Sequence, residues 1–147
     1  MNTKILSLTL LVISVGLAVT LPASAALSDA DKAVIKVAAV STLSNTGDYY
    51  YINTEINWDN TITFWFISKE TDTDSSVMAI SQIIGAYSGI CRNHPDLSDC
   101  YLYIGTRESV NGRMYCLRTW IDNLGPNPSD TEAGVLVMMV INTFTAA

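Results

Sequence analysis

Basic residues are scarce in this sequence. Of 147 residues, 8 are Lys or Arg and 14 are Asp or Glu, which gives a formal net charge of −6 at pH 7. Nucleic-acid backbones and anionic membranes are bound by clustered Lys and Arg, whereas here the basic residues are scattered among acidic ones. The composition therefore argues against nucleic-acid binding and against attachment to an anionic membrane.

Residues that commonly hold metals or phosphates are also few. The chain has one histidine and three cysteines, with no cysteine pair at zinc-binding spacing. It lacks a glycine-rich phosphate loop and a Gly-x-Ser-x-Gly nucleophile motif. We therefore expect no metal and no cofactor. Two carboxylates brought together by folding would leave no local mark, so a hydrolase is not excluded.

One long apolar run is present, at the N-terminus. Lys4 precedes the apolar residues 5–21, and Pro22-Ala23-Ser24-Ala25 places small residues at the −3 and −1 positions of a cleavage site. This pattern predicts a signal peptide over residues 1–25 and a single domain over residues 26–147. An uncleaved anchor is the alternative, but the run is short for spanning a bilayer. We expect an extracytoplasmic protein, secreted or periplasmic, without membrane attachment after cleavage.

Helix caps and apolar periodicity predict two helices before the middle of the domain. Ser28 caps a first helix that runs to about Leu43. Asp74 or Ser75 caps a second helix that runs to about Arg92, where Asn-His-Pro stops it. Both helices have a modest apolar stripe, so we expect each to cover a sheet.

Two features bear on how the helices pack. Gly85 and Gly89 lie on one side of the second helix, which weakens it but permits the close approach of a neighbour. A last helix begins with a capping box formed by Ser129 and Glu132. Its residues 135–141 are apolar on every side, so it is either deeply buried or forms the contact of a homodimer. The β-branched residues in this segment also allow a strand.

Residues 49–58 and 61–68 are dense in aromatic and β-branched types and predict a hairpin. A two-residue loop pairs Trp58 with Thr61, and a three-residue loop pairs Trp58 with Ile62. We favour the second, because it gathers one apolar face consisting of Ile52, Ile56, Trp58, Ile62, Phe64 and Phe66.

A second hairpin is predicted from residues 100–107 and 113–121, with Asn111 and Gly112 as the central turn residues. This register gives two faces of opposite character. One face carries Leu102, Ile104, Tyr115, Leu117 and Ile121, and the other carries Tyr101, Tyr103, Arg107, Cys116, Arg118 and Trp120.

The order helix, hairpin, helix, hairpin, helix predicts an α+β domain. Its simplest form is a four-stranded antiparallel sheet with helices on one face. If the other face is open, Tyr101, Tyr103 and Trp120 are exposed beside Arg107 and Arg118, and this set suits a protein, a peptide or a carbohydrate. If another element covers it, the set is core. The leading hypothesis is an exported, non-enzymatic binding module, and a hydrolase is the alternative.

Three cysteines in an exported chain suggest one disulfide and one free thiol. In the predicted register Cys100 and Cys116 are about 24 Å apart along the strands, too far for a bond. Cys91 and Cys100 are close in sequence, so we predict a Cys91–Cys100 disulfide. Cys116 is then a free thiol beside Arg107 and Arg118, and these two cations favour the thiolate.

Overall fold

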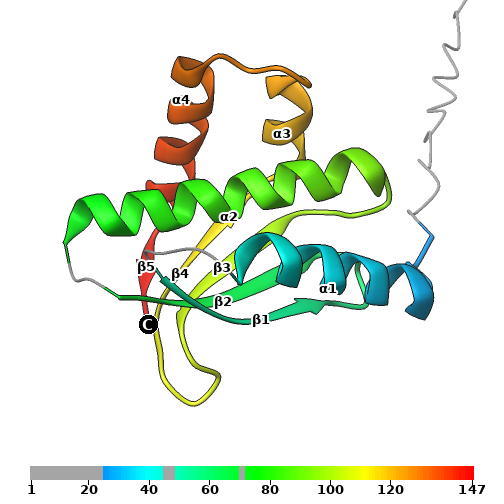
Figure 1. Cartoon of the computed structure of the whole chain (residues 1–147), viewed down its shortest axis with the longest axis horizontal. Coiled ribbons are helices and arrows are strands. Elements are labelled where there is room, and N and C mark those ends of the chain that lie inside the picture. The colour runs from blue at the N-terminus through cyan, green and yellow to red at the C-terminus, as the bar shows by residue number, and fades with distance from the viewer. Residues whose placement is uncertain (1–24, 45–48, 70–71) are drawn as a thin grey trace, which may run out of the picture.

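The computed structural model describes residues 25–44, 49–69 and 72–147. The predicted α+β class is confirmed, with helices packed on a five-stranded sheet of order β1-β2-β3-β4-β5 (Figure 1). Residues 1–24 of the predicted signal peptide lie outside the described residues. No helix in the described ranges is long and apolar enough to cross a membrane. The elements are α1 (Asp29–Leu43), β1 (Tyr49–Ile56), β2 (Ile62–Ser68), α2 (Thr73–Asn93), β3 (Cys100–Gly105), β4 (Val110–Cys116), α3 (Arg118–Leu124), α4 (Asp130–Ile141) and β5 (Thr145–Ala146).

The sheet is mixed, so the prediction of four antiparallel strands was wrong. The two hairpins, β1–β2 and β3–β4, are antiparallel as expected. However, β2 and β3 run parallel, with Ile62 opposite Cys100 and Phe66 opposite Ile104. This happens because α2 carries the chain back along the sheet before β3 begins, as parallel neighbours require. The short β5 adds a fifth strand beside Gly112.

Local signals located α1, α2 and α4 closely, whereas α3 was not predicted. The Ser28 side chain accepts a hydrogen bond from the Asp31 N–H at the start of α1. Ser129 and Glu132 form the predicted capping box of α4, so the strand alternative for this segment was wrong. Helix α2 begins slightly earlier than predicted, because Asp72 rather than Asp74 or Ser75 is its cap.

The first hairpin keeps the β2 part of the predicted face, since Ile62, Phe64 and Phe66 are buried, but not the predicted loop. Ile56 pairs with Ile62, and residues 57–61 form the loop between the strands. Trp58 was predicted to be core, but it lies in this loop and is 85% exposed. Ile52 lies at an irregularity of β1 and is 40% exposed, because the bulge takes it out of the alternation.

The loop is longer than a tight turn because it is built around Asn60. Asn60 has a left-handed backbone conformation, with φ of 63°, and its side chain is buried. Its side-chain oxygen accepts from the Leu27 N–H at 2.9 Å, and its amide nitrogen donates to the Ala25 carbonyl at 2.8 Å. The start of the domain is thereby attached to the end of the first hairpin.

The turn of the second hairpin lies at Arg107 and Glu108, so the Asn111-Gly112 turn was wrong. Thr106 and Ser109, which flank this turn, exchange backbone hydrogen bonds of 3.0 and 3.2 Å. Gly105 precedes the turn with φ of 121°, and a β-carbon there would collide with the Ser109 carbonyl oxygen. The turn therefore requires glycine at residue 105.

The predicted strand over residues 113–121 was also too long. Strand β4 ends at Cys116, and α3 begins at Arg118. Gly112 lies inside β4, where the ring of Phe144 occupies the space that a β-carbon would need. The Asn111-Gly112 pair therefore does not form a turn. Gly112 is instead the place where β4 and the C-terminal segment approach each other closely.

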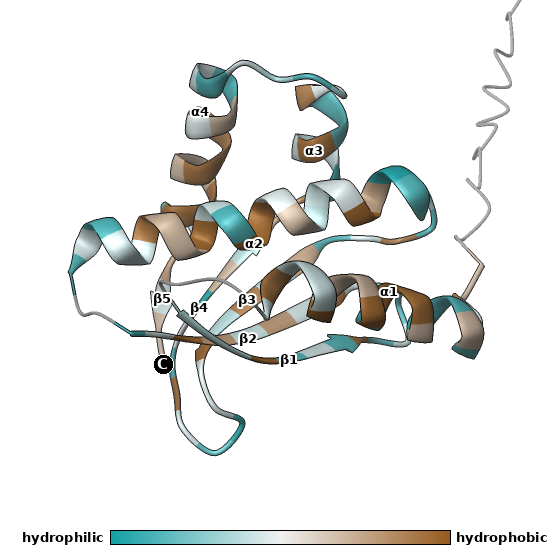
Figure 2. Cartoon of the chain, in the orientation of Figure 1, coloured by the Kyte–Doolittle hydropathy of each residue, from teal (hydrophilic) through white to brown (hydrophobic). Residues whose placement is uncertain are grey.

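The core lies between the sheet and the two helices α1 and α2, which lie side by side across it (Figure 1). Apolar residues recur along both helices, whereas the β3–β4 turn and the ends of α2 are hydrophilic (Figure 2). Side chains of this core that are buried include Ile35, Ala39 and Leu43 of α1, Ile83, Tyr87 and Ile90 of α2, and Ile62, Phe64, Phe66, Leu102 and Met114 of the sheet.

Helix α4 is buried on one side, so its prediction as a deeply buried helix was wrong. Leu136, Val137 and Val140 are buried. Val135 and Met138 are 56% and 53% exposed. The homodimer contact that the same pattern suggested stays a prediction, and the exposed side of α4 is the surface on which it would form.

Candidate functional site

The sheet face opposite α1 and α2 is rich in aromatic residues and partly open to solvent. Side chains alternate along each strand, so every second residue of a strand lies on this face. There it lies beside the residues of the neighbouring strands that pair with it. Tyr50 is 60% exposed, and Tyr101 and Tyr115 are 36% and 39% exposed. We call this surface the open face, and its aromatic residues are Tyr50, Trp65, Tyr101, Tyr103 and Tyr115.

Two of the predicted binding residues, Tyr101 and Tyr103, lie together on the open face. Tyr101 is opposite Tyr115 on β4, and Tyr103 is opposite Arg113. On the other side, the ring of Trp65 stacks on Tyr103 with centroids 4.6 Å apart and planes 18° apart. Trp65, Tyr115 and Arg113 were missed, because the parallel pairing of β2 with β3 and the true β4 register are not visible in the sequence.

A hollow of about 340 Å³ lies over the β3–β4 part of the open face. Arg113 is exposed there and makes no ion pair with a carboxylate in the part of the chain that the structure describes. The Thr143 hydroxyl is held by the backbone of Tyr115, from whose N–H it accepts at 2.9 Å. The hollow thus combines aromatic rings, hydroxyls and one cation, and it is lined by Tyr101, Tyr103, Arg113, Met114, Tyr115, Thr143 and Thr145.

Arg107 borders this surface from the β3–β4 turn. It forms an ion pair with Glu55 of β1. Strand β2 lies between β1 and β3 in the sheet, so this pair spans the open face. The charge of Arg107 is therefore partnered, and its role in binding stays a prediction.

Arg118 lies elsewhere and has a structural environment. It is the first residue of α3, and its guanidinium pairs with Asp122 at 2.8 Å. The same group donates to the carbonyl oxygens of Leu97 at 2.7 Å and Pro95 at 3.3 Å. Arg118 therefore connects α3 to the segment between α2 and β3, and the placement beside Tyr101 was wrong because β4 ends before it.

Trp120 is also displaced from its predicted place, since it belongs to α3 rather than to a strand. Its ring centroid is 5.9 Å from that of Tyr115, with planes 31° apart. Trp120 is thus next to one ring of the open face without being part of the sheet. Its role in binding stays a prediction.

The cysteines are all free and buried, so the predicted Cys91–Cys100 disulfide was wrong. The exclusion of Cys100 from the neighbourhood of Cys116 was also wrong, because the true turn places them directly opposite each other. Cys116 is free as predicted, but it does not face Arg107. Burial raises the pKa of Cys91 to about 11 and that of Cys116 to about 12, so both are protonated at neutral pH.

The carboxylates whose pKa is lowered accept hydrogen bonds from residues close to them in the chain. A hydrogen bond from the Thr61 hydroxyl lowers the pKa of Asp59, and backbone N–H donors of Ser75 and Ser129 lower the pKa of Asp72 and Glu132. Within residues 25–44, 49–69 and 72–147, no group of three or more His, Cys, Asp or Glu side chains could hold a metal ion. These shifts therefore mark a turn and two helix caps.

Comparison of the chain with protein-family models, with curated proteins and with solved structures gives no match. What the protein does therefore has to be argued from the chemistry of its own surfaces.

Proposed function

We propose that the protein is a small exported binding module, without catalytic activity, that holds its partner on the open face. The observation that supports this most is the hollow around Arg113, bordered by Tyr101, Tyr103 and Tyr115. Tyr and Arg are among the residues that contribute most to binding energy at protein interfaces. A cluster of partly exposed rings is also uncommon on a surface with no partner.

The chemistry of the hollow favours an acidic peptide segment of a partner protein. The Arg113 guanidinium has the planar shape that binds both oxygens of a carboxylate. The neighbouring tyrosine rings offer apolar surface and hydroxyl groups at low entropic cost, because each ring has few rotatable bonds. A carbohydrate would use the same rings and hydroxyls but would need the guanidinium less, which separates the two ligands.

Peptide selection from a display library tests the proposal without a known partner. The wild-type chain is the target, and the double variant Tyr103→Ala/Arg113→Gln is used for counter-selection. Trp58→Ala is the control, because Trp58 is 85% exposed in the β1–β2 loop, away from the hollow. We expect enriched peptides with acidic residues that bind wild type and the control alike and the double variant at least tenfold more weakly.

Equal binding to the double variant would place the binding surface elsewhere. Binding of neutral oligosaccharides with the same dependence on Tyr103, but none on Arg113, would replace the peptide by a carbohydrate. The competing hypothesis of a hydrolase needs two carboxylates in one cleft. Turnover of ester, glycoside or peptide substrates by purified wild type, lost on substitution of a carboxylate, would favour that hydrolase and overturn the non-enzymatic proposal.

A further inference from the structure

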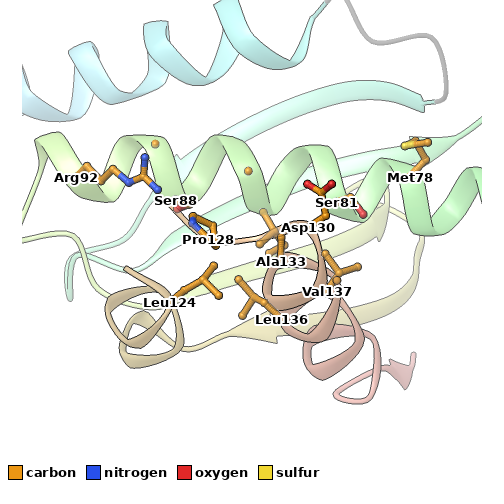
Figure 3. A pocket seen from close by; sticks show the side chains of 14 residues that line it. Met78, Ser81, Ser88, Arg92, Leu124, Pro128, Asp130, Ala133, Leu136 and Val137 are labelled. Carbon is orange, nitrogen blue, oxygen red and sulfur yellow. The ribbon is translucent and has the colours of Figure 1, made fainter. Parts of the chain in front are cut away.

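A larger cavity lies on the other side of the molecule, between α2 and the pair α3 and α4 (Figure 3). Its volume is about 870 Å³. Sites for small molecules in proteins commonly enclose about 300–1,000 Å³. We call it the α2–α4 groove, and it runs along α2 from Met78 to Arg92.

Three glycines in the middle of helices line this groove. Gly85 and Gly89 come from α2 and Gly134 from α4. A β-carbon at any of them would meet no atom within 4 Å, so no close neighbour requires them. The close approach that the sequence suggested for Gly85 and Gly89 was wrong. Glycine inside a helix makes the helix less stable than alanine would. In this helix pair the missing side chains leave room in the groove.

Apolar and charged groups are separated along the groove. Ile84, Leu136 and Val137 supply apolar surface in its walls. Arg92 lies at one end of α2 and its side chain extends along the groove (Figure 3). It makes no ion pair with a carboxylate among the residues that the structure describes. Asp130 lies further along, drawn beside Ser81 (Figure 3).

We propose that the α2–α4 groove binds a single-chain amphiphile with an anionic head group, such as a fatty acid. The head group pairs with Arg92, and the aliphatic chain lies over the glycines toward Met78. Over this stretch α2 rises by about 21 Å, at about 1.5 Å per residue, which is the scale of a long aliphatic chain. Asp130 repels an anion from the middle of the groove, so the two charges together set the direction of the ligand.

The probe for this proposal is dodecanoate below its micellar concentration, titrated calorimetrically into the full exported protein. Dodecyltrimethylammonium is the matched probe with the opposite charge. We expect one saturable site for dodecanoate and at least tenfold weaker binding of the cation. Because the site is separate from the open face, peptide binding to Tyr103 and Arg113 is unaffected, so either proposal can fail alone.

Two variants test the geometry. Gly85→Leu fills the groove and replaces a poor helix former, so we expect a melting temperature no lower than that of wild type and loss of dodecanoate binding. Arg92→Gln keeps the groove and should weaken dodecanoate at least fivefold without weakening the cation, because the charge that repels the cation is removed. Arg113→Gln, on the opposite side of the sheet, is the control and should bind as wild type does.

Three results would overturn the inference. The first is no saturable binding of dodecanoate to wild type. The second is unchanged binding by a folded Gly85→Leu variant, which would place the amphiphile elsewhere. The third is a wild-type dimer in sedimentation that Gly85→Leu separates, because a second copy of the chain would then occupy the groove.

Discussion

The ring of Phe144 lies over Gly112, in the space that a side chain at residue 112 would fill. This contact joins the C-terminal segment to β4, next to the short pairing of β4 with β5. We expect Gly112→Ala to destabilise the fold by up to about 1 kcal/mol, since the half-exposed ring of Phe144 must move. The Gly112→Ala/Phe144→Ala double variant should lose less than the sum of the two single variants, as measured by urea denaturation. Additive losses would mean that the two residues do not interact.

Substitution by alanine should have opposite effects on the stability of the fold at Gly105 and at Gly134. Gly105→Ala should destabilise by at least about 1 kcal/mol, because its positive φ and the Ser109 carbonyl leave no room for a β-carbon. Gly134→Ala, in open space on α4, should stabilise by up to about 1 kcal/mol. Thermal denaturation of both variants checks the pair. Equal effects would show that the β3–β4 turn is not at Arg107 and Glu108.

Arg118 should matter for stability rather than for binding. Its guanidinium satisfies the carbonyl oxygens of Leu97 and Pro95 together with Asp122. A lysine cannot present the same fork of donors, so Arg118→Lys should cost about 1–3 kcal/mol. Urea denaturation gives this value, and affinity for the ligand of the open face should be unchanged in the folded variant. A stable Arg118→Lys variant with weakened binding would return Arg118 to the binding site.

The buried thiols should make the protein sensitive to alkali. The pKa of Cys91 rises from 9.0 to about 11 and that of Cys116 from 9.0 to about 12, with burial as the first cause. Since the folded pKa exceeds the unfolded one, the stability that these thiols contribute is complete below pH 9 and declines as the pH rises toward 11–12. Cys91→Ala should show a shallower decline in the free energy of unfolding than wild type.

The same burial predicts the behaviour of the thiols toward labelling reagents. Cys91, Cys100 and Cys116 should all be unreactive toward maleimide in the native protein and all reactive after denaturation without a reductant. Intact mass before and after labelling counts them. A mass that shows fewer than three reactive thiols in the denatured chain would contradict the free cysteines of the structure.

Intact mass of the protein purified from its host also tests the predicted signal peptide. We expect a chain that begins at Ala26. Such a chain keeps the hydrogen bond from the Leu27 N–H to the Asn60 side chain, although it loses the Ala25 carbonyl that Asn60 also binds. A mass that includes residues 1–25 would contradict cleavage and with it the proposed export as a free domain.

Helices α1, α2 and α4 could be predicted from the sequence because their signals are local. Ser28 reaches the Asp31 N–H within one helical turn, and the Ser129–Glu132 box closes within the same distance. Such contacts depend on residues three or four positions apart, so tertiary structure changes them little. The apolar periodicity likewise predicted which residues of β2 face the helices.

The candidate site could be predicted only in part. Tyr101 and Tyr103 share a face because alternation along one strand is a local property. Trp65 and Arg113 join them only through the pairing of β3 with β2 and β4. Arg118 and Trp120 were misplaced because the end of β4 depends on its packing, which the run of apolar and aromatic residues does not reveal.

By itself, then, the sequence determined α1, α2 and α4, the two hairpins and the α+β class, but not α3, whose first residues it assigned to a strand. The register of β3 on β4, the parallel pairing with β2 and the neighbourhood of the cysteines were decided by the tertiary structure alone. The physical reason is visible at two glycines. Gly105 is needed by a turn a few residues away, whereas Gly112 is needed by Phe144, far along the chain. A local pattern cannot distinguish these requirements, and choosing the wrong one moves every cross-strand pair.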